Sequence, residues 1–153
     1  MLTIALNVLT DYTGVTLGCS PWTSITQERV NTFADATGDH QWIHVDVDRA
    51  TQESPWKSPV AHGFLTLSML PALNQQVFTI TGTAASINYG MNKVRFPSAV
   101  KVGAKVRSNV ELLSAEPQDA SRVLACYRTT VEILGEDRPA CVVESLVMYV
   151  SEE

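Results

Sequence analysis

The chain has 153 residues, 45% of them apolar, and a formal net charge of −5 from 11 basic and 16 acidic side chains. This length predicts a single domain over residues 1–153, with enough apolar residues for a substantial core. The acidic balance argues against nucleic acid or an anionic membrane as the main partner. It still allows a phosphate-bearing ligand to bind a local basic patch.

The three cysteines, Cys19, Cys126 and Cys141, form neither a CxxC pair nor a Cys/His cluster. A disulfide framework and a zinc site are therefore both disfavoured, and we expect no metal and a reducing compartment. The start of the chain lacks a basic segment and contains Asp11, which argues against a secretory signal. No apolar stretch reaches the roughly 20 residues that span a bilayer. Together these features predict a cytoplasmic protein.

The first part of the chain predicts an arm followed by a capped helix. Residues 1–20 suggest a strand or loose arm that ends at Gly18 and Pro21. Thr26 is suited to cap a helix, and Gly38 is suited to end it in a left-handed conformation. Apolar and small residues at helical spacing mark one face between them: Val30, Phe33, Ala34 and Thr37.

A short turn or helix is expected around residues 46–50, followed by a proline-containing loop over residues 54–59. A second helix is predicted over residues 62–78, and its side chains are apolar on nearly all sides. Such a helix is normally enclosed on most sides by other structure. Because an interior proline disrupts a helix, we expect a kink at Pro71 or a helix that restarts there.

Beyond Gly82 the hydrophobic pattern changes to a period of two, which is typical of strands. The clearest alternating segments are 106–112, 123–133 and 141–149, and the turns between them lie at 116–119 and 135–138. Sequential strands joined by short turns predict an antiparallel sheet. A curved sheet wrapped around the apolar helix would satisfy both patterns, which is an α+β architecture.

Asp39 and His44 lie five positions apart, just beyond the predicted end of the first helix. A carboxylate and an imidazole can jointly hold a water and move its proton, which suits adding water to a polarised double bond. The alternative is that Asp39 only caps a turn and His44 is a half-buried structural histidine.

His62 and Gly63 stand at the predicted start of the apolar helix. Free backbone N–H groups there would stabilise a thioester oxygen that becomes enolate-like. Glycine also lets a ligand approach the backbone closely. The alternative is that Gly63 merely permits the turn and His62 packs.

A strand segment after the apolar helix mixes aromatic, amide and cationic residues: Asn88, Tyr89, Gly90, Lys93 and Arg95. Lys93 and Arg95 share one parity and can meet phosphate on one face. They can equally be two solvated charges. No phosphate loop, GxSxG elbow or HExxH motif accompanies them.

Three motifs in this order resemble the MaoC-like (R)-specific enoyl-CoA hydratases, also called the hydratase 2 family. Thr37-Gly38-Asp39 followed by Ile43-His44 and then Ala50 is similar to the hydratase 2 motif. Residues 61–65 resemble the start of the family's central hotdog helix, and residues 88–97 are also similar. The resemblance covers residues 20–150, and it is strongest to short single-domain actinobacterial hydratases and nodulation protein N.

The resemblance implies a hotdog fold, a homodimer joined edge to edge, and syn addition of water to a trans-2-enoyl-CoA. The product would be the (R)-3-hydroxyacyl-CoA, in fatty acid metabolism. Asp39 and His44 match the catalytic residues, and Gly63 matches the residue whose N–H binds the thioester oxygen. We expect substrate contacts from Gln41, His62, Asn88, Tyr89, Gly90, Lys93 and Arg95. No separate cofactor is expected, because CoA, or acyl carrier protein, is part of the substrate.

One departure concerns the loop between the two catalytic residues. The family usually has Asn-Pro where this chain has Gln41-Trp42. Two other functions remain open: a hotdog acyl-CoA thioesterase and a non-catalytic acyl-CoA-binding module. Thioesterases of this fold generally place a carboxylate on the central helix, whereas residues 62–78 contain no Asp or Glu. The presence of both Asp39 and His44 argues against a non-catalytic module.

Overall fold

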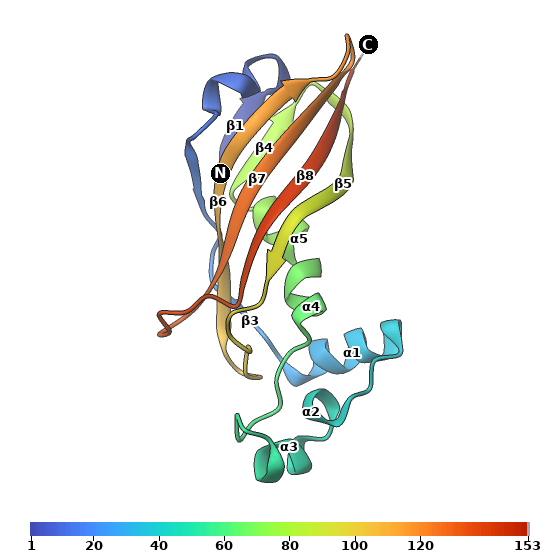
Figure 1. Cartoon of the computed structure of the whole chain (residues 1–153), viewed down its shortest axis with the longest axis vertical. Coiled ribbons are helices and arrows are strands. Elements are labelled where there is room, and N and C mark those ends of the chain that lie inside the picture. The colour runs from blue at the N-terminus through green and yellow to red at the C-terminus, as the bar shows by residue number, and fades with distance from the viewer. Residues whose placement is uncertain (153) are drawn as a thin grey trace.

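A curved antiparallel sheet forms the body of the structure, a computed structural model that describes residues 1–152 (Figure 1). The strands pair in the order β2-β6-β7-β8-β5, and the short β3 also pairs with β6. Their bounds are β2 Thr16–Cys19, β3 Thr23–Ser24, β5 Thr83–Arg95, β6 Lys105–Pro117, β7 Arg122–Ile133 and β8 Cys141–Ser151. Every pairing within this sheet is antiparallel, so the predicted sheet is confirmed.

The long strands form because their side chains alternate between the inner and outer faces of the sheet. In β6, Val106 and Val110 are buried against the helices, whereas Arg107 and Glu111 lie on the outer face and are partly exposed. The outer-face charges pair across strands, as in the 2.7 Å contact from Arg107 Nε to Glu132 Oε2. The period-two pattern therefore identified the strands correctly.

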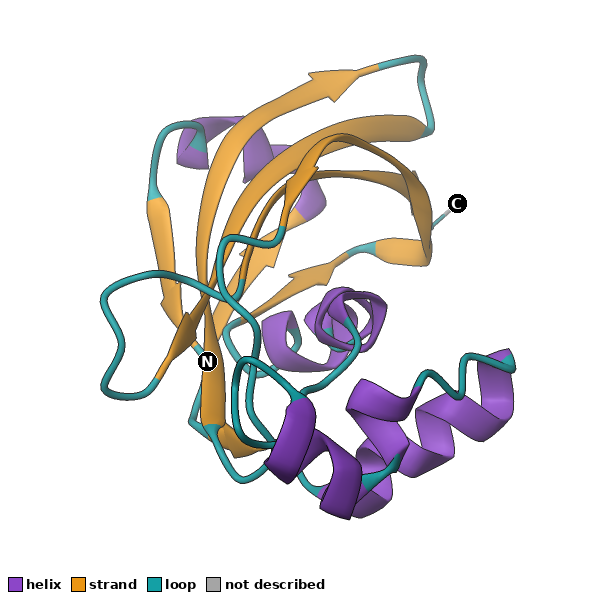
Figure 2. Ribbon diagram, turned by 60° about the horizontal axis from the view of Figure 1, so that its bottom comes forward, coloured by secondary structure: helices purple, strands orange, loops and turns teal. Residues whose placement is uncertain are grey.

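The central helix lies against the inner face of the sheet (Figure 2). It consists of α4, Gly63–Ser68, and α5, Leu70–Asn74. The break falls at Met69, and Pro71 occupies the first turn of α5. A proline there removes an N–H that would lack a helical partner in any case. The predicted restart at this proline is confirmed.

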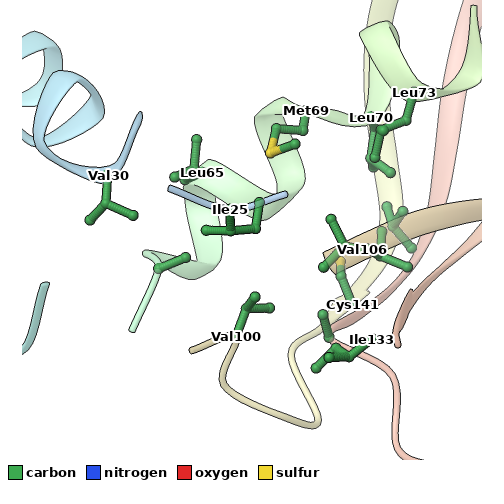
Figure 3. Close-up of a cluster of buried hydrophobic side chains, with 14 residues drawn as sticks. Ile25, Val30, Leu65, Met69, Leu70, Leu73, Val100, Val106, Ile133 and Cys141 are labelled. Atoms are coloured by element: carbon green, nitrogen blue, oxygen red, sulfur yellow. The ribbon is translucent and has the colours of Figure 1, made fainter. Parts of the chain in front are cut away.

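Apolar side chains from the central helix fill a core between the sheet and the first helices. Figure 3 shows this cluster, which gathers Leu65, Met69 and Leu73 of the central helix with Val106 of β6 and Cys141 of β8. The expected enclosure of the helix is incomplete within this chain. Phe64 is 70% exposed, because one side of the helix faces an open groove.

The N-terminal arm packs on the other end of the sheet. It contains β1, Leu2–Ala5, and a 3₁₀ helix, Leu6–Tyr12, before β2. Strand β1 pairs in parallel with β4, Phe78–Thr81, which follows the central helix. This parallel pair was not predicted, because its two strands lie more than 70 residues apart in the chain. The helix predicted over residues 62–78 was also too long, since α5 ends at Asn74 and Phe78 begins β4.

Three further helices lie below the sheet, beside the start of the central helix (Figure 1). They are α1, Gln27–Thr37, α2, Trp42–Val45, and α3, Val47–Glu53. The short helix expected near residues 46–50 is α3, and Asp46 caps it by accepting a hydrogen bond from Arg49 N at 3.0 Å. Across residues 1–152, every helix is too short or too polar to cross a bilayer.

Strand β5 forms one edge of the sheet. It pairs only with β8 over its described length, so its other edge has no strand partner in this chain. Its side chains are largely exposed, including Ile87 at 49%, Tyr89 at 62% and Met91 at 47%. A long apolar edge of this kind offers free backbone groups to another strand. With this edge, the sheet and the enclosed helix match the expected hotdog fold.

Candidate active site

Helix α1 and its end position Asp39. Thr26 caps the helix by accepting a hydrogen bond from Arg29 N at 3.2 Å. Gly38 ends it in the left-handed conformation with φ of 78°, which a residue without Cβ adopts at little cost. The chain therefore turns sharply, and Asp39 is the first residue beyond the turn. Both predicted boundaries of this helix are confirmed.

Two hydrogen bonds hold His44 in place, one at its imidazole and one at its backbone carbonyl. Its Nδ1 lies 2.6 Å from the carbonyl oxygen of Val60. Because a carbonyl can only accept, Nδ1 carries the hydrogen and Nε2 carries the free lone pair. The carbonyl of His44 itself accepts a hydrogen bond from Gln27 Nε2 at 2.7 Å, which ties α2 to α1. His44 is therefore oriented as a proton acceptor.

His62 is buried next to Asp39 and His44 and contacts both. Its Nε2 donates to the backbone carbonyl of Asp39 at 2.9 Å, and its ring stacks on His44 with centroids 3.8 Å apart and planes at 26°. Phe33 packs on the same imidazole at 5.0 Å. His62 is only 2% exposed, so it offers almost no surface to a ligand. The predicted substrate contact by this residue therefore has no support in the geometry.

Burial lowers the pKa of His44 below its usual value of 6.5. The Val60 carbonyl opposes this shift, nearby His62 reinforces it, and Asp39 opposes it weakly. His44 is thus neutral at physiological pH. A neutral imidazole with a free Nε2 can accept a proton from water.

Asp39, His44 and His62 each bring one potential ligand atom within 4.8 Å of the others. Two histidines and a carboxylate are a common ligand set for transition metals. However, imidazole lone pairs lie in the ring plane, and the nearly parallel stack directs them side by side instead of towards one point. The geometry is therefore poorly suited to metal, and the absence of a metal stays a prediction.

Gly63 begins α4, where the first N–H groups have no partner inside the helix. A Cβ built on Gly63 would meet ring carbons of Phe96 at 3.3 Å. Glycine was expected to let a ligand come close to the backbone here, but the group that comes close to Gly63 is the ring of Phe96, which follows β5. Sequence reasoning did not assign Phe96 a role, although it lies in the third motif. A glycine fits this position without strain, because the helix start packs closely against an aromatic ring.

A groove of about 870 Å³ runs between the central helix and the inner face of β5, β7 and β8. It extends from Asp39 past Phe64, Ser68 and Pro71 to Phe78. Two buried hydroxyls, those of Tyr127 and Tyr149, hydrogen-bond each other at 2.8 Å among its lining residues. Most of the lining is apolar, so the groove is suited to an acyl chain.

The other residues predicted to contact substrate, apart from Gln41, lie at different places along β5. Asn88 lines the groove. Lys93 pairs in register with Glu144, and Arg95 with Val142, which puts both cations on the outer face of the sheet, as their shared parity predicted. Tyr89 is exposed, and Gly90 lies between two register shifts of β5. Neither is part of the groove lining.

Gln41 is exposed and begins the α2 segment, and its backbone N–H points to Asp39 Oδ1 at 3.4 Å. Trp42 stacks under the guanidinium of Arg49, 4.3 Å from the ring centroid. This packing holds the loop where the resembled family has Asn-Pro.

Residues 10–133 of the chain match the family model described as the MaoC-like domain. The 3-hydroxyacyl-thioester dehydratase Z of Mycobacterium tuberculosis (strain H37Rv) is 52% identical over 138 residues, 90% of this chain and 91% of that protein. Nodulation protein N of Rhizobium leguminosarum bv. viciae is 45% identical and covers 83% of this chain and 80% of its own length.

Among solved structures, the unliganded R-hydratase PhaJ1 of Pseudomonas aeruginosa has a TM-score of 0.70 at 25% identity. The similarity covers 92% of this chain and 83% of that one.

Proposed function

Because this chain belongs to the MaoC-like domain family, we propose that it is an (R)-specific enoyl-thioester hydratase. It adds water reversibly to a trans-2-enoyl thioester and forms the (R)-3-hydroxyacyl thioester. The observation that carries this proposal is that Asp39 lies at one end of an apolar groove with His44 within 4.8 Å of its carboxylate. The names of the dehydratase and R-hydratase relatives agree with this activity.

The two catalytic side chains match the two hydrogens of one water. The carboxylate of Asp39 and the lone pair of His44 Nε2 are both acceptors, so each can hold one O–H of a water between them. As the water oxygen bonds to C3, one of the two groups takes its proton and returns it to C2. The oxygen and the proton then arrive on the same face, which is syn addition.

Negative charge develops on the thioester oxygen during this step. The first N–H groups of α4, beginning at Gly63, lie beside the catalytic pair and have no helical partner. Such donors lower the barrier because they stabilise the oxygen more strongly in the transition state than in the ground state. We therefore assign Gly63 the role of thioester-oxygen donor.

We further propose that the acyl chain lies in the groove and that the phosphopantetheine arm leaves past Asp39. The arm belongs to CoA or to acyl carrier protein. Asn88 would contact the thioester end, and Gln41 would contact the arm near the loop. Tyr89, Gly90, Lys93 and Arg95 lie along β5, and the two cations on its outer face could bind the phosphates of CoA. Whether the substrate is a thioester of CoA or of acyl carrier protein is tested by comparing kcat/KM for the crotonyl thioesters of the two.

The free edge of β5 supports a homodimer joined edge to edge. A second β5 would satisfy its unpaired backbone groups and cover the apolar side chains Ile87, Tyr89 and Met91. It would also bring a second central helix near the exposed Phe64. Sedimentation equilibrium should then give twice the 16.7 kDa mass of the chain.

The activity is tested with purified protein and crotonyl-CoA, by the loss of absorbance at the enoyl-thioester band. Wild type should produce (R)-3-hydroxybutyryl-CoA. Asp39→Asn and His44→Ala should each lose about 10²–10⁴-fold in kcat, because each removes a group that moves or holds the water proton. His40→Asn is the matched control, since His40 is exposed and contacts Asp35.

A wild-type protein inactive on crotonyl-CoA and on longer enoyl thioesters would contradict the proposal. Hydrolysis of the thioester instead of hydration would indicate a thioesterase. Within residues 63–74, however, the central helix carries no Asp or Glu that could serve such an enzyme.

A further inference from the structure

The side chain of His62 is polar, buried and placed where it touches both catalytic residues. We propose that His62 is a positioning residue for the hydration, an inference that rests on the function proposed above. Its Nε2–H fixes the backbone of Asp39, and its ring fixes the plane of His44. The two catalytic groups are thereby held at one mutual distance.

The hydrogen bond from His62 to Asp39 spans 23 positions of the chain. The Asp39 side chain is exposed, and its carboxylate accepts a long 3.4 Å hydrogen bond from Gln41 N within the same loop. Its backbone carbonyl, in contrast, is anchored to a buried residue at 2.9 Å. Because the carboxylate is two bonds from the Cα, fixing the backbone limits where the carboxylate can lie.

The ring of His44 is fixed by two different contacts. The Val60 carbonyl binds Nδ1 and sets the tautomer. The His62 ring covers one face at 3.8 Å and stops the imidazole from tilting. Phe33 supports His62 in turn, with ring planes at 55°. The order Phe33, His62, His44 is a packed column that ends at the catalytic nitrogen.

The chemistry of this position distinguishes a hydrogen-bonding role from simple packing. His62 Nδ1 is buried and has no hydrogen-bond partner. Burying an unsatisfied polar atom is destabilising, and an apolar aromatic side chain would avoid this cost. A histidine at this position is therefore best explained by a need for its Nε2 donor, although its Nδ1 is left without a hydrogen bond.

Two amide substitutions separate the donor from the bulk of the side chain. The amide nitrogen of His62→Gln reaches about as far as Nε2, whereas that of His62→Asn reaches only about as far as Nδ1. We expect His62→Asn to lower kcat for crotonyl-CoA about 10-fold or more, because small misplacements of catalytic groups are costly. KM should change little, since His62 does not line the groove. His62→Gln should regain most of the lost kcat.

The pH profile tests the contact between the two rings. Burial is the main cause that lowers the pKa of His44, and His62 adds to it, whereas the Val60 carbonyl and Asp39 raise the pKa. Both amide variants should therefore move the acid limb of kcat/KM to higher pH. A residue that only fills space would change the thermal midpoint and leave this limb in place.

His62→Phe provides the second test if an amide variant does not fold. It keeps the ring and the stack but lacks the donor, so kcat should fall while KM is retained. Wild-type kcat in His62→Phe, or equal kcat in the Gln and Asn variants, would overturn the proposal. An inactive wild-type enzyme would instead contradict the hydratase function itself, and that result is obtained before any variant is made.

Discussion

Substitution of Gly63 by alanine tests whether the start of the central helix must stay close to Phe96. The new Cβ would lie 3.3 Å from two ring carbons of Phe96 and 3.4 Å from a third. Comfortable carbon–carbon contacts lie at about 3.5–4.0 Å, so the ring or the helix start must shift by a few tenths of an ångström. Phe96 is 42% exposed and has room to move. We therefore expect a change in unfolding free energy of no more than about 1 kcal/mol.

The effect on catalysis should be larger than the effect on stability. Removing an oxyanion donor costs about 10²–10³-fold in rate, so displacing one should cost less, roughly 10-fold in kcat. This corresponds to about 1.4 kcal/mol of transition-state stabilisation. The assay is crotonyl-CoA hydration, with urea unfolding measured on the same samples.

The double variant Gly63→Ala/Phe96→Ala separates the contact from the donor. Without the ring, the alanine has nothing to strike, so kcat should return close to that of Phe96→Ala alone. Full activity of Gly63→Ala would refute the reasoning. So would a double variant no better than Gly63→Ala, because the loss would then not arise from Phe96.

Three further outcomes are expected. Activity should need neutral His44, so kcat/KM should fall only below pH 6.5, as the pH drops through the lowered pKa of His44. The stability that comes from keeping His44 neutral is fully present above pH 6.5, and urea titrations should show its loss as the pH falls through that same pKa. Tyr127→Phe should lower the unfolding free energy by about 1–3 kcal/mol, because it leaves the buried Tyr149 hydroxyl without its partner, and an unchanged urea midpoint would argue against that bond. Ser68→Phe should block long enoyl chains more than crotonyl, because Ser68 lines the groove beyond Asp39; equal loss for both substrates, measured as kcat/KM, would place the chain elsewhere.

The local features of this protein were predictable from its sequence because short-range physics produces them. The Thr26 cap, the Gly38 stop and the break at Pro71 depend on hydrogen bonds and dihedral angles within a few residues. The alternation in β6, β7 and β8 reflects burial on one face of a sheet. The spacing of Asp39 and His44 likewise placed both residues in the short segment beyond α1, where Asp39 follows the turn and His44 lies in α2.

Contacts between distant segments depended on the tertiary structure. The carbonyl that orients His44 belongs to Val60, and the ring that stacks on it belongs to His62. Phe96 meets Gly63 from across the fold, and β1 pairs with β4 in parallel. No local pattern encodes these pairs, because packing the central helix into the sheet creates them. The sequence by itself was enough to predict which residues could carry the chemistry, whereas only the tertiary structure decided which neighbours hold them in place, because those neighbours come from distant parts of the chain.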